Sequence, residues 1–346
     1  MTTTTYGDIS PAVAAYSVVR MLKRATPYLQ LEKFGQTYVL PTNSTQTAKF
    51  RRYFMTGATG SAGTGTGDFN IPLATTALTE GVTPTGSTLS NADYTVTLGQ
   101  YGDYIEITDV IMDTHTDNVL QQATDILGEQ AAVTVETLRF NVLKAGTNVY
   151  YGDNAANRAA IDTAITLADQ RRVTTGLNRQ NAKKISQVVA STPDFNTKSV
   201  EAAYMAVCHP DLETDIRTMA GFKSVADYGP HTTPFEGEIG SVEQVRYMCS
   251  TVISAFADAG GTAATNGLRS TTGTSADVYP VLFFGRDAFG IVPLKGKSAM
   301  TPMVVNPKPA ASDPLGQRGT VGWKLYTSTV ILQEAFMARL EVGSTA

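Results

Sequence analysis

The sequence predicts a mixed α+β fold from three features. The stretch 117–145 carries apolar residues every three or four positions, which is typical of a long amphipathic helix. Residues 94–98 and 104–107 alternate between apolar and polar side chains, as half-buried strands do. Short apolar runs such as 278–284 follow the helix and read as buried strands. The order of these elements indicates α+β, with the two ends of the chain meeting around the long helix.

Composition limits the possible classes of protein. A chain of 346 residues can bury a sizeable core, and we expect two or three domains. Charged residues make up 17%, below the usual value of about a quarter. The net charge of −4 gives no reason to expect a dedicated nucleic-acid partner. No signal peptide or membrane-spanning run is evident, so we expect a soluble protein made in a cytoplasm.

The first segment does not resemble a compact domain. Residues 11–25 show a short helical pattern that ends in basic side chains, and Pro27 closes it. A short amphipathic helix must lay its apolar face on another surface. We interpret 1–36 as an arm, and a helix packed on its own domain is the open alternative.

The next segment predicts a long β-hairpin. Residues 37–54 are extended, the stretch 57–68 is rich in Gly and Thr, and a second extended run returns at 94–98. We expect a bulge or kink at Gly99 and Gly102. Because a two-stranded hairpin is marginal alone in water, it needs a partner surface.

The helical stretch 117–145 is the expected spine, roughly 40 Å long at about 1.5 Å per residue. Thr116 or Asp117 suits its N-cap, and Gly146 suits its C-terminal stop. Leu127 and Leu138 should be buried on one face.

The remaining elements are shorter. We expect a second helix over 158–179, a strand over 202–207, and a helix that His209, Pro210 and Asp211 open and that runs to Met219. Further strands are predicted at 242–253, at 278–284 and through much of 323–342.

The sequence offers little evidence for catalysis. Asp109, Asp113, His115 and Asp117 match no metal-binding loop, and capping of the spine is the better explanation of the acidic residues among them. Cys208 and His209 are adjacent, so on a strand they point to opposite faces. We interpret Cys208 and Cys249 as reduced core residues. Without a nucleotide, zinc-protease or nucleophile motif, we expect no enzyme and no cofactor.

Several segments, in order from about residue 35 to the end, resemble the major capsid proteins of tailed phages, in particular the group typified by the phage N-four coat protein. These segments are LTEGVTP at 78–84, QYGDYIEITDVIMDTHTDNVL at 100–120, LGEQAA at 127–132, AGTNV at 145–149, HPD at 209–211, GEIGSVEQVR at 237–246, FFGRDAFG at 283–290, SDPLGQRGTVGWK at 312–324 and ILQEAFMARLE at 331–341. SDPLGQRGTVGWK together with GEIGSVEQVR is the most specific signal. The stretch 57–68 departs from the pattern as an insertion.

This resemblance implies the Hong Kong 97-like capsid fold. The parts would be an N-terminal arm at 1–36, an extended E-loop hairpin at 37–99, a peripheral domain at 100–199 with the spine, an axial domain at 200–300, and C-terminal strands at 301–346 that return to the peripheral domain. The implied function is self-assembly into an icosahedral head that encloses phage DNA.

The implied partners are other copies of the chain, as hexamers and pentamers, with a portal and scaffolding or decoration proteins. Packaged double-stranded DNA would touch the inner face non-specifically, and no membrane is involved. The protein would reside in the virion and assemble in the bacterial host cytoplasm. An encapsulin-type cargo shell would share the fold, and a receptor-binding or tail protein is a further alternative.

We also predict contacts between subunits. Lys49, Arg51 and Arg52 on the outgoing hairpin strand would face acidic groups of a neighbouring copy, among Glu80, Asp103, Glu106, Asp109 and Asp113. The simpler interpretation is a solvated strand end, where an exposed ion pair contributes about 0–1 kcal/mol.

Overall fold

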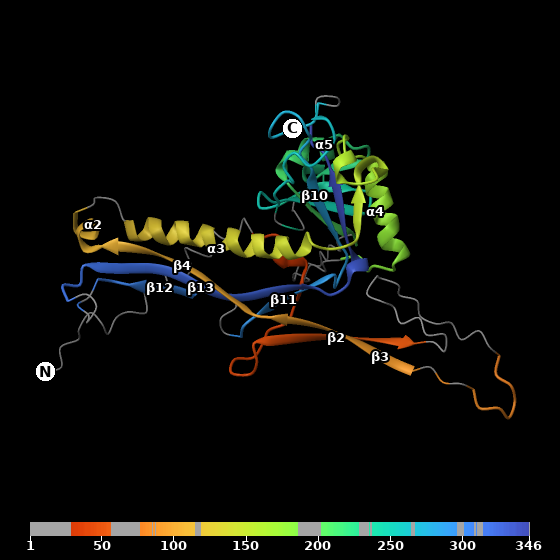
Figure 1. Ribbon diagram of the computed structural model, residues 1–346, viewed down its shortest axis with the longest axis horizontal. Helices are drawn as coiled ribbons and strands as arrows, with labels where there is room; N and C mark the ends of the chain where they lie inside the picture. The colour runs from red at the N-terminus through yellow and green to blue at the C-terminus, as the bar shows by residue number, and fades with distance from the viewer. Residues whose placement is uncertain are drawn as a thin grey trace, which may run out of the picture.

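The computed structural model describes residues 29–56, 77–84, 86, 88–114, 119–185, 202–227, 235, 237–263, 267–295, 301–307, 309 and 314–345. The molecule is elongated (Figure 1). A compact part contains the C-terminus, a long helix and sheet extend from it in one direction, and a two-stranded hairpin projects towards the other end. The predicted helix at 11–25 and the Gly/Thr-rich stretch 57–68 lie outside the described residues.

The extended part is a helix lying on a sheet. Helix α3 (Val119–Leu143) covers one face of a five-stranded sheet. Its strands are β1 (Gln36–Thr37), β11 (Phe289–Pro293), β13 (Arg318–Ile331), β12 (Thr301–Val305) and β4 (Gly99–Thr108). The 14-residue strand β13 is the centre, because it pairs with β4, β11 and β12. Leu127 and Ala131 of the helix pack on Val321 and Trp323 of this strand. The predicted spine is confirmed.

The buried face of α3 turns along the helix, and one prediction about it was wrong. Leu127 is buried, but Leu138 is only partly buried. Near its C-terminal end the helix buries Phe140 and Leu143 instead, against a second sheet. The physical reason is that the helix changes partner along its length. The expected N-cap residues lie outside the described part of the chain, and the helix stops at Leu143, three residues before Gly146.

The compact part is built on a mixed seven-stranded sheet. In spatial order its strands are β5 (Val149–Tyr151), β14 (Met337–Val342), β10 (Tyr279–Phe284), β6 (Tyr204–Cys208), β9 (Val245–Cys249), β8 (Glu238–Val242) and β7 (Phe222–Ser224). Helices α4 (Leu167–Arg179) and α5 (Glu213–Thr218) contribute to the hydrophobic core on one face. The end of α3 and the 3-10 turn Leu31–Phe34 contribute to the core on the other face. The spine therefore joins the two sheets.

Two predicted elements need correction. The helix expected over 158–179 begins only at Leu167, where Thr166 accepts a hydrogen bond from the Asp169 backbone N–H at 3.2 Å as N-cap. The strand expected over 242–253 is instead the second half of a hairpin, β8–β9. Glu243, at φ 50°, makes the tight turn between the two strands. The strand predicted at 278–284 and the helix opened by His209 are confirmed.

The hairpin is a separate two-stranded sheet. Strands β2 (Thr47–Thr56) and β3 (Thr88–Thr97) pair antiparallel along their full length. Of the bulge or kink predicted at Gly99 and Gly102, the structure shows a break only beside Gly99: Leu98, which is buried, separates β3 from β4. The prediction at Gly102 was wrong, because this residue pairs with Lys324 in a register that runs without a shift along β4. At Leu98 the chain changes partner from β2 to β13, so this break is the root of the hairpin.

The described end of the predicted arm packs on its own chain. Leu31 and Phe34 are buried in the core beside Phe289. Strand β1 then runs parallel to β11 in the five-stranded sheet, and Leu40 continues beside Leu294. Residues 29–40 therefore belong to the body of the molecule, and the hairpin leaves the body after residue 40.

Candidate assembly interface

Strand alternation divides the basic residues of β2 between two faces. Lys49, Arg51 and Tyr53 point outward, whereas Phe50 and Arg52 lie on the half-buried face. The Phe50 ring approaches Gly290 and packs edge-on against Tyr38, with ring centroids 5.6 Å apart. Arg52 donates a hydrogen bond to Gln333. The three residues do not form one cluster, because Arg52 attaches the hairpin to the body.

The outward basic residues meet a carboxylate of their own hairpin. Asp93 is the register partner of Arg51 and accepts two hydrogen bonds from its guanidinium, at 2.7 and 2.9 Å. Lys49 lies 3.5 Å from the same carboxylate. The hydrogen bond with Arg51 is the main cause that lowers the pKa of Asp93. Two cations thus share one carboxylate, and this face keeps an excess positive charge.

The predicted acidic partners lie at two ends of the molecule. Glu80 is exposed in the segment 77–84, at the hairpin end. Glu106 is exposed on β4, and Asp109 starts the short helix α2 (Asp109–Thr114), where its side chain accepts from the Val110 backbone N–H at 2.8 Å. Asp103 accepts a hydrogen bond from Gln130 of the spine at 2.6 Å. The side chain of Asp113 lies outside the described structure. Figure 1 places α2 far from the hairpin, so Lys49 and Arg51 do not reach Glu106 or Asp109 of their own chain.

The five-stranded sheet has an outer face that the spine does not cover. Tyr104, Gly322 and Met303 are register partners across β4, β13 and β12, and Val305 lies beside them. Tyr104 is 62% exposed and Val305 56%. Between them lies a shallow groove of about 580 Å³, which Lys324 and Thr320 also line. Gly322 forms its floor: a Cβ there would lie 2.8 Å from the Cβ of Tyr104, too close for any larger residue.

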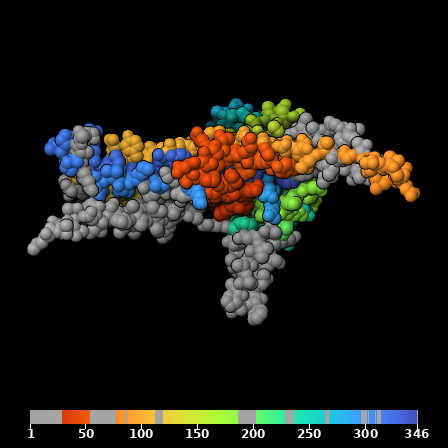
Figure 2. Space-filling view, turned by 90° about the horizontal axis from the view of Figure 1, so that it is seen from below, coloured from red at the N-terminus to blue at the C-terminus, as the bar shows by residue number. Residues whose placement is uncertain are grey.

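The hairpin lies on the same side of the molecule as this outer face. Figure 2 looks at the molecule from that side, with β12 and β13 in blue at one end and the orange residues of the hairpin end at the other. Residues 29–56, in red, lie across the middle. Exposed apolar side chains continue on the hairpin, where Tyr53 is 61% and Leu89 72% exposed. The side away from the spine therefore carries the groove and the hairpin, both with exposed apolar side chains.

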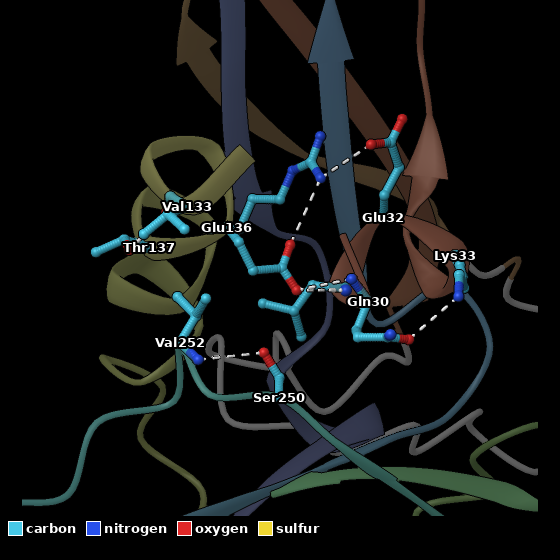
Figure 3. A network of polar contacts seen from close by, with 10 residues as sticks. Gln30, Glu32, Lys33, Val133, Glu136, Thr137, Ser250 and Val252 are labelled. Carbon is cyan, nitrogen blue, oxygen red and sulfur yellow. Dashed lines mark hydrogen bonds and ion pairs between the residues drawn. The ribbon is translucent and has the colours of Figure 1, made fainter. Parts of the chain in front are cut away.

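A buried polar contact holds residues 30–32, which precede the hairpin in the chain, against the spine (Figure 3). Glu136 of α3 is fully buried, and its Oε1 accepts from the backbone N–H groups of Gln30 and Leu31 at 3.0 and 2.8 Å. Arg139, one turn on, lies 3.7 Å from Glu136 and donates to Glu32 at 3.0 Å. Burial raises the pKa of Glu136, while the Leu31 N–H and Arg139 oppose the rise. We call this the spine latch: Gln30, Leu31, Glu32, Glu136 and Arg139.

The residues considered for chemistry have structural partners. The His209 imidazole Nδ1 accepts from the Asp211 backbone N–H at 3.2 Å and caps the turn that follows, as predicted. The Cys208 thiol contacts the Met248 carbonyl oxygen and Cys249 instead of that imidazole. Within the described residues, no group of three or more His, Cys, Asp and Glu side chains could hold a metal ion. No helix in that part of the chain has the length and apolar character to cross a membrane.

Comparison with known families identifies the type of protein. The family model described as phage capsid protein matches residues 91–339, which is most of the chain. This chain belongs to the phage capsid protein family. Its role is therefore structural, as a capsid protein, and the resemblance seen in the sequence motifs is confirmed.

Individual relatives agree with the family. The chain is 22% identical over 263 residues to the major capsid protein of Pseudomonas phage KPP21, and it spans 66% of that protein's length. Its fold is similar to the capsid of Ralstonia phage GP4, with a TM-score of 0.63, 14% identity, and 90% and 87% of the two chains covered. The SrpI encapsulin of Synechococcus elongatus PCC 7942 also shares the fold, at a TM-score of 0.52 and 11% identity, with 100% of this chain and 92% of that chain covered. The fold is thus Hong Kong 97-like.

The sequence motifs gain a physical explanation. In GEIGSVEQVR, Glu238 and Arg246 form a buried ion pair at 2.8 Å across the β8–β9 hairpin. In SDPLGQRGTVGWK, Gly316 makes a turn at φ 65° and Gly322 allows β4 to pass closely. Sequence reasoning missed Asp93, Glu136 and the outer sheet face. Only for Asp93 was a signal present, since hairpin pairing places it opposite Arg51.

Proposed function

We propose that this protein is the major subunit of a closed icosahedral phage head that encloses double-stranded DNA, built from hexamers and pentamers of the chain. The observation that carries this proposal is the projecting hairpin. Among the residues that the structure describes, its strands pair only with each other, and its outward face exposes Tyr53 and Leu89. Because an isolated two-stranded sheet is marginal in water, such an element needs a surface on another molecule. In a shell of identical subunits, that surface belongs to the next copy.

We propose that the hairpin of one copy lies on the extended part of its neighbour. Lys49 and Arg51 would then approach the acidic end of that neighbour, at Glu106 and Asp109. Glu80, exposed near the hairpin's far end, remains a proposed contact residue. Arg52 is turned towards Gln333 of its own chain, so we assign it to the attachment of the hairpin.

The division into capsid domains follows the two sheets in this proposal. The five-stranded sheet with the spine would be the peripheral domain, and the seven-stranded sheet with α4 and α5 the axial domain. In that division, β5, α4 and β14 go with the axial domain, because they pack in or on its sheet. The E-loop would begin after residue 40, where the chain leaves β11.

The proposed role as a subunit of a phage head implies further binding partners. DNA would touch the inner face without sequence preference, and a portal with scaffolding or decoration proteins would complete the particle. Such a particle assembles in the host cytoplasm, and the protein then resides in the virion. An encapsulin-type cargo shell is the second candidate, favoured only by the shared fold.

Electron microscopy of the purified protein tests the proposal. We expect closed icosahedral particles with hexameric and pentameric units, and hairpin density on adjacent subunits. Particles from infected cells should contain nuclease-protected DNA, whereas a cargo shell would contain a protein instead. A chain that stays monomeric at high concentration under all salt conditions, and in the presence of its co-expressed phage partners, would contradict the proposal.

A further inference from the structure

The two cysteines of the chain lie next to each other in the seven-stranded sheet. Cys208 ends β6 and Cys249 ends β9, and the two residues are register partners in this parallel pair. Their Sγ atoms are 3.8 Å apart, although 41 positions separate them in the chain. Cys208 belongs to the core that α5 covers, and Cys249 packs against the same core. The sheet therefore places two thiols side by side.

The pairing of the two strands is compatible with a disulfide between these register partners. Neighbouring strands lie about 4.7–4.9 Å apart, within the range of about 4.4–6.8 Å between the Cα atoms of a disulfide. The two sulfurs lie 3.8 Å apart, and a disulfide requires them to approach to about 2 Å.

The two thiols differ in access. Cys208 is fully buried, whereas Cys249 is partly exposed. The hydrogen bond with Cys249 and, after it, burial raise the pKa of the Cys208 thiol. A small oxidant in solution therefore meets Cys249 first, and Cys208 stays a thiol until its neighbour has reacted.

We propose that Cys208 and Cys249 form a reversible disulfide when the protein meets a small disulfide such as oxidised glutathione. The Cys249 thiolate attacks one glutathione sulfur, the S–S bond of the oxidant breaks, and one glutathione leaves. Cys208 then attacks the Cys249 Sγ, loses its proton to the solvent, and expels the second glutathione as thiolate. The two cysteines lose two electrons and two protons in total, and the oxidant becomes two thiols.

The bond links the two central parallel strands of the compact part. It closes a loop that contains α5, β7 and β8, and so restricts the unfolded chain. The biological role of this disulfide rests on the proposed function. A head assembled in a reducing cytoplasm would form the disulfide after release into oxidising surroundings. The chemistry itself does not depend on assembly.

Treatment of the full-length protein with oxidised glutathione, followed by proteolysis without reduction and mass spectrometry, tests the proposal. We expect a peptide containing Cys208 linked to one containing Cys249, with a mass lower by two hydrogen atoms. The melting temperature should rise on oxidation and return to its starting value with dithiothreitol. The variant Cys249→Ser, altered at the more exposed position, should show neither effect. Cys208→Ala serves as the second control.

The proposal is overturned if glutathione stays on Cys249 while Cys208 remains available to alkylation after unfolding. Linkage of Cys249 to Cys249 of another copy would overturn it equally. Both measurements use the unassembled chain as well as particles. Failure of the protein to form shells would therefore count against the proposed function and leave this test unaffected.

Discussion

At the scale of single residues, the spine depends on which face of α3 meets the sheet. Leu127 is 1% exposed and packs on Val321 and Trp323, whereas the adjacent Ile126 is 55% exposed. The two residues offer a matched pair, because they share an element and have side chains of equal size.

We expect Leu127→Ala to lower the free energy of unfolding by about 2–5 kcal/mol, because it leaves a cavity between helix and sheet. Ile126→Ala should change it by less than about 0.5 kcal/mol, as surface substitutions usually do. Chemical denaturation of the unassembled subunit measures both. Equal effects of the two variants would show that the helix face is assigned incorrectly.

The spine latch is a second feature at this scale. Glu136→Ala should cost about 2–5 kcal/mol, since it leaves the Gln30 and Leu31 N–H groups buried without their acceptor. Glu136→Gln should cost less, because the amide oxygen can still accept and Arg139 keeps Glu32. Denaturant titrations at neutral pH compare the two variants.

The latch also predicts a pH dependence. The pKa of Glu136 is raised in the folded protein, mainly by burial, so the folded state holds this proton more tightly than the unfolded state. The resulting contribution to stability is present below the unfolded pKa of about 4.3 and is lost as pH rises through the higher folded value. As the pH rises through that interval, the wild type should therefore lose stability relative to the variant Glu136→Gln, which has no titratable group at this position. A pH-independent difference would argue against burial of an ionisable Glu136.

At the scale of elements, the hairpin carries an ion pair between its two strands. Arg51 and Asp93 are directly opposite each other, and like charges at such a position destabilise a strand pair. Arg51→Glu should therefore loosen the hairpin and impair assembly. The double variant Arg51→Glu with Asp93→Arg restores an opposite-charge pair and the net charge of the face.

We expect the double variant to recover both protease resistance of the hairpin and particle formation, measured by limited proteolysis and light scattering. The unassembled body should melt like the wild type in both variants. Recovery of the hairpin without recovery of assembly would show that Arg51 itself, rather than the charge of the face, contacts the neighbouring copy.

At the scale of the whole molecule, the surface away from the spine is the proposed contact. Tyr104 and Gly322 line the groove, and the aromatic side chain of Tyr104 is exposed. Tyr104→Asp should reduce particle yield at least tenfold while the free subunit keeps its circular dichroism and melting temperature, since a buried unpaired charge is costly in an interface. Tyr104→Phe, which keeps the ring, should assemble like the wild type. Normal yield from Tyr104→Asp, measured by size-exclusion chromatography, would place the contact elsewhere.

Periodicity along the sequence determined the elements that depend on neighbours in the chain. The spine, the hairpin and the strand at 278–284 follow from local patterns of side chains. Alternation along β2 also contained the information that Arg52 faces away from Lys49 and Arg51. Motifs spread over the chain pointed to the capsid family before any contact was known.

Only the tertiary structure decided which distant residues meet. The pairing of Glu136 with Gln30 and Leu31, of Arg52 with Gln333 and of Cys208 with Cys249 joins positions far apart in sequence. The same holds for the limited burial of Leu138, because the helix moves from one sheet to the other along its length. Local pattern specifies a strand or a helix through backbone geometry, whereas its partner depends on how all elements bury their apolar faces together.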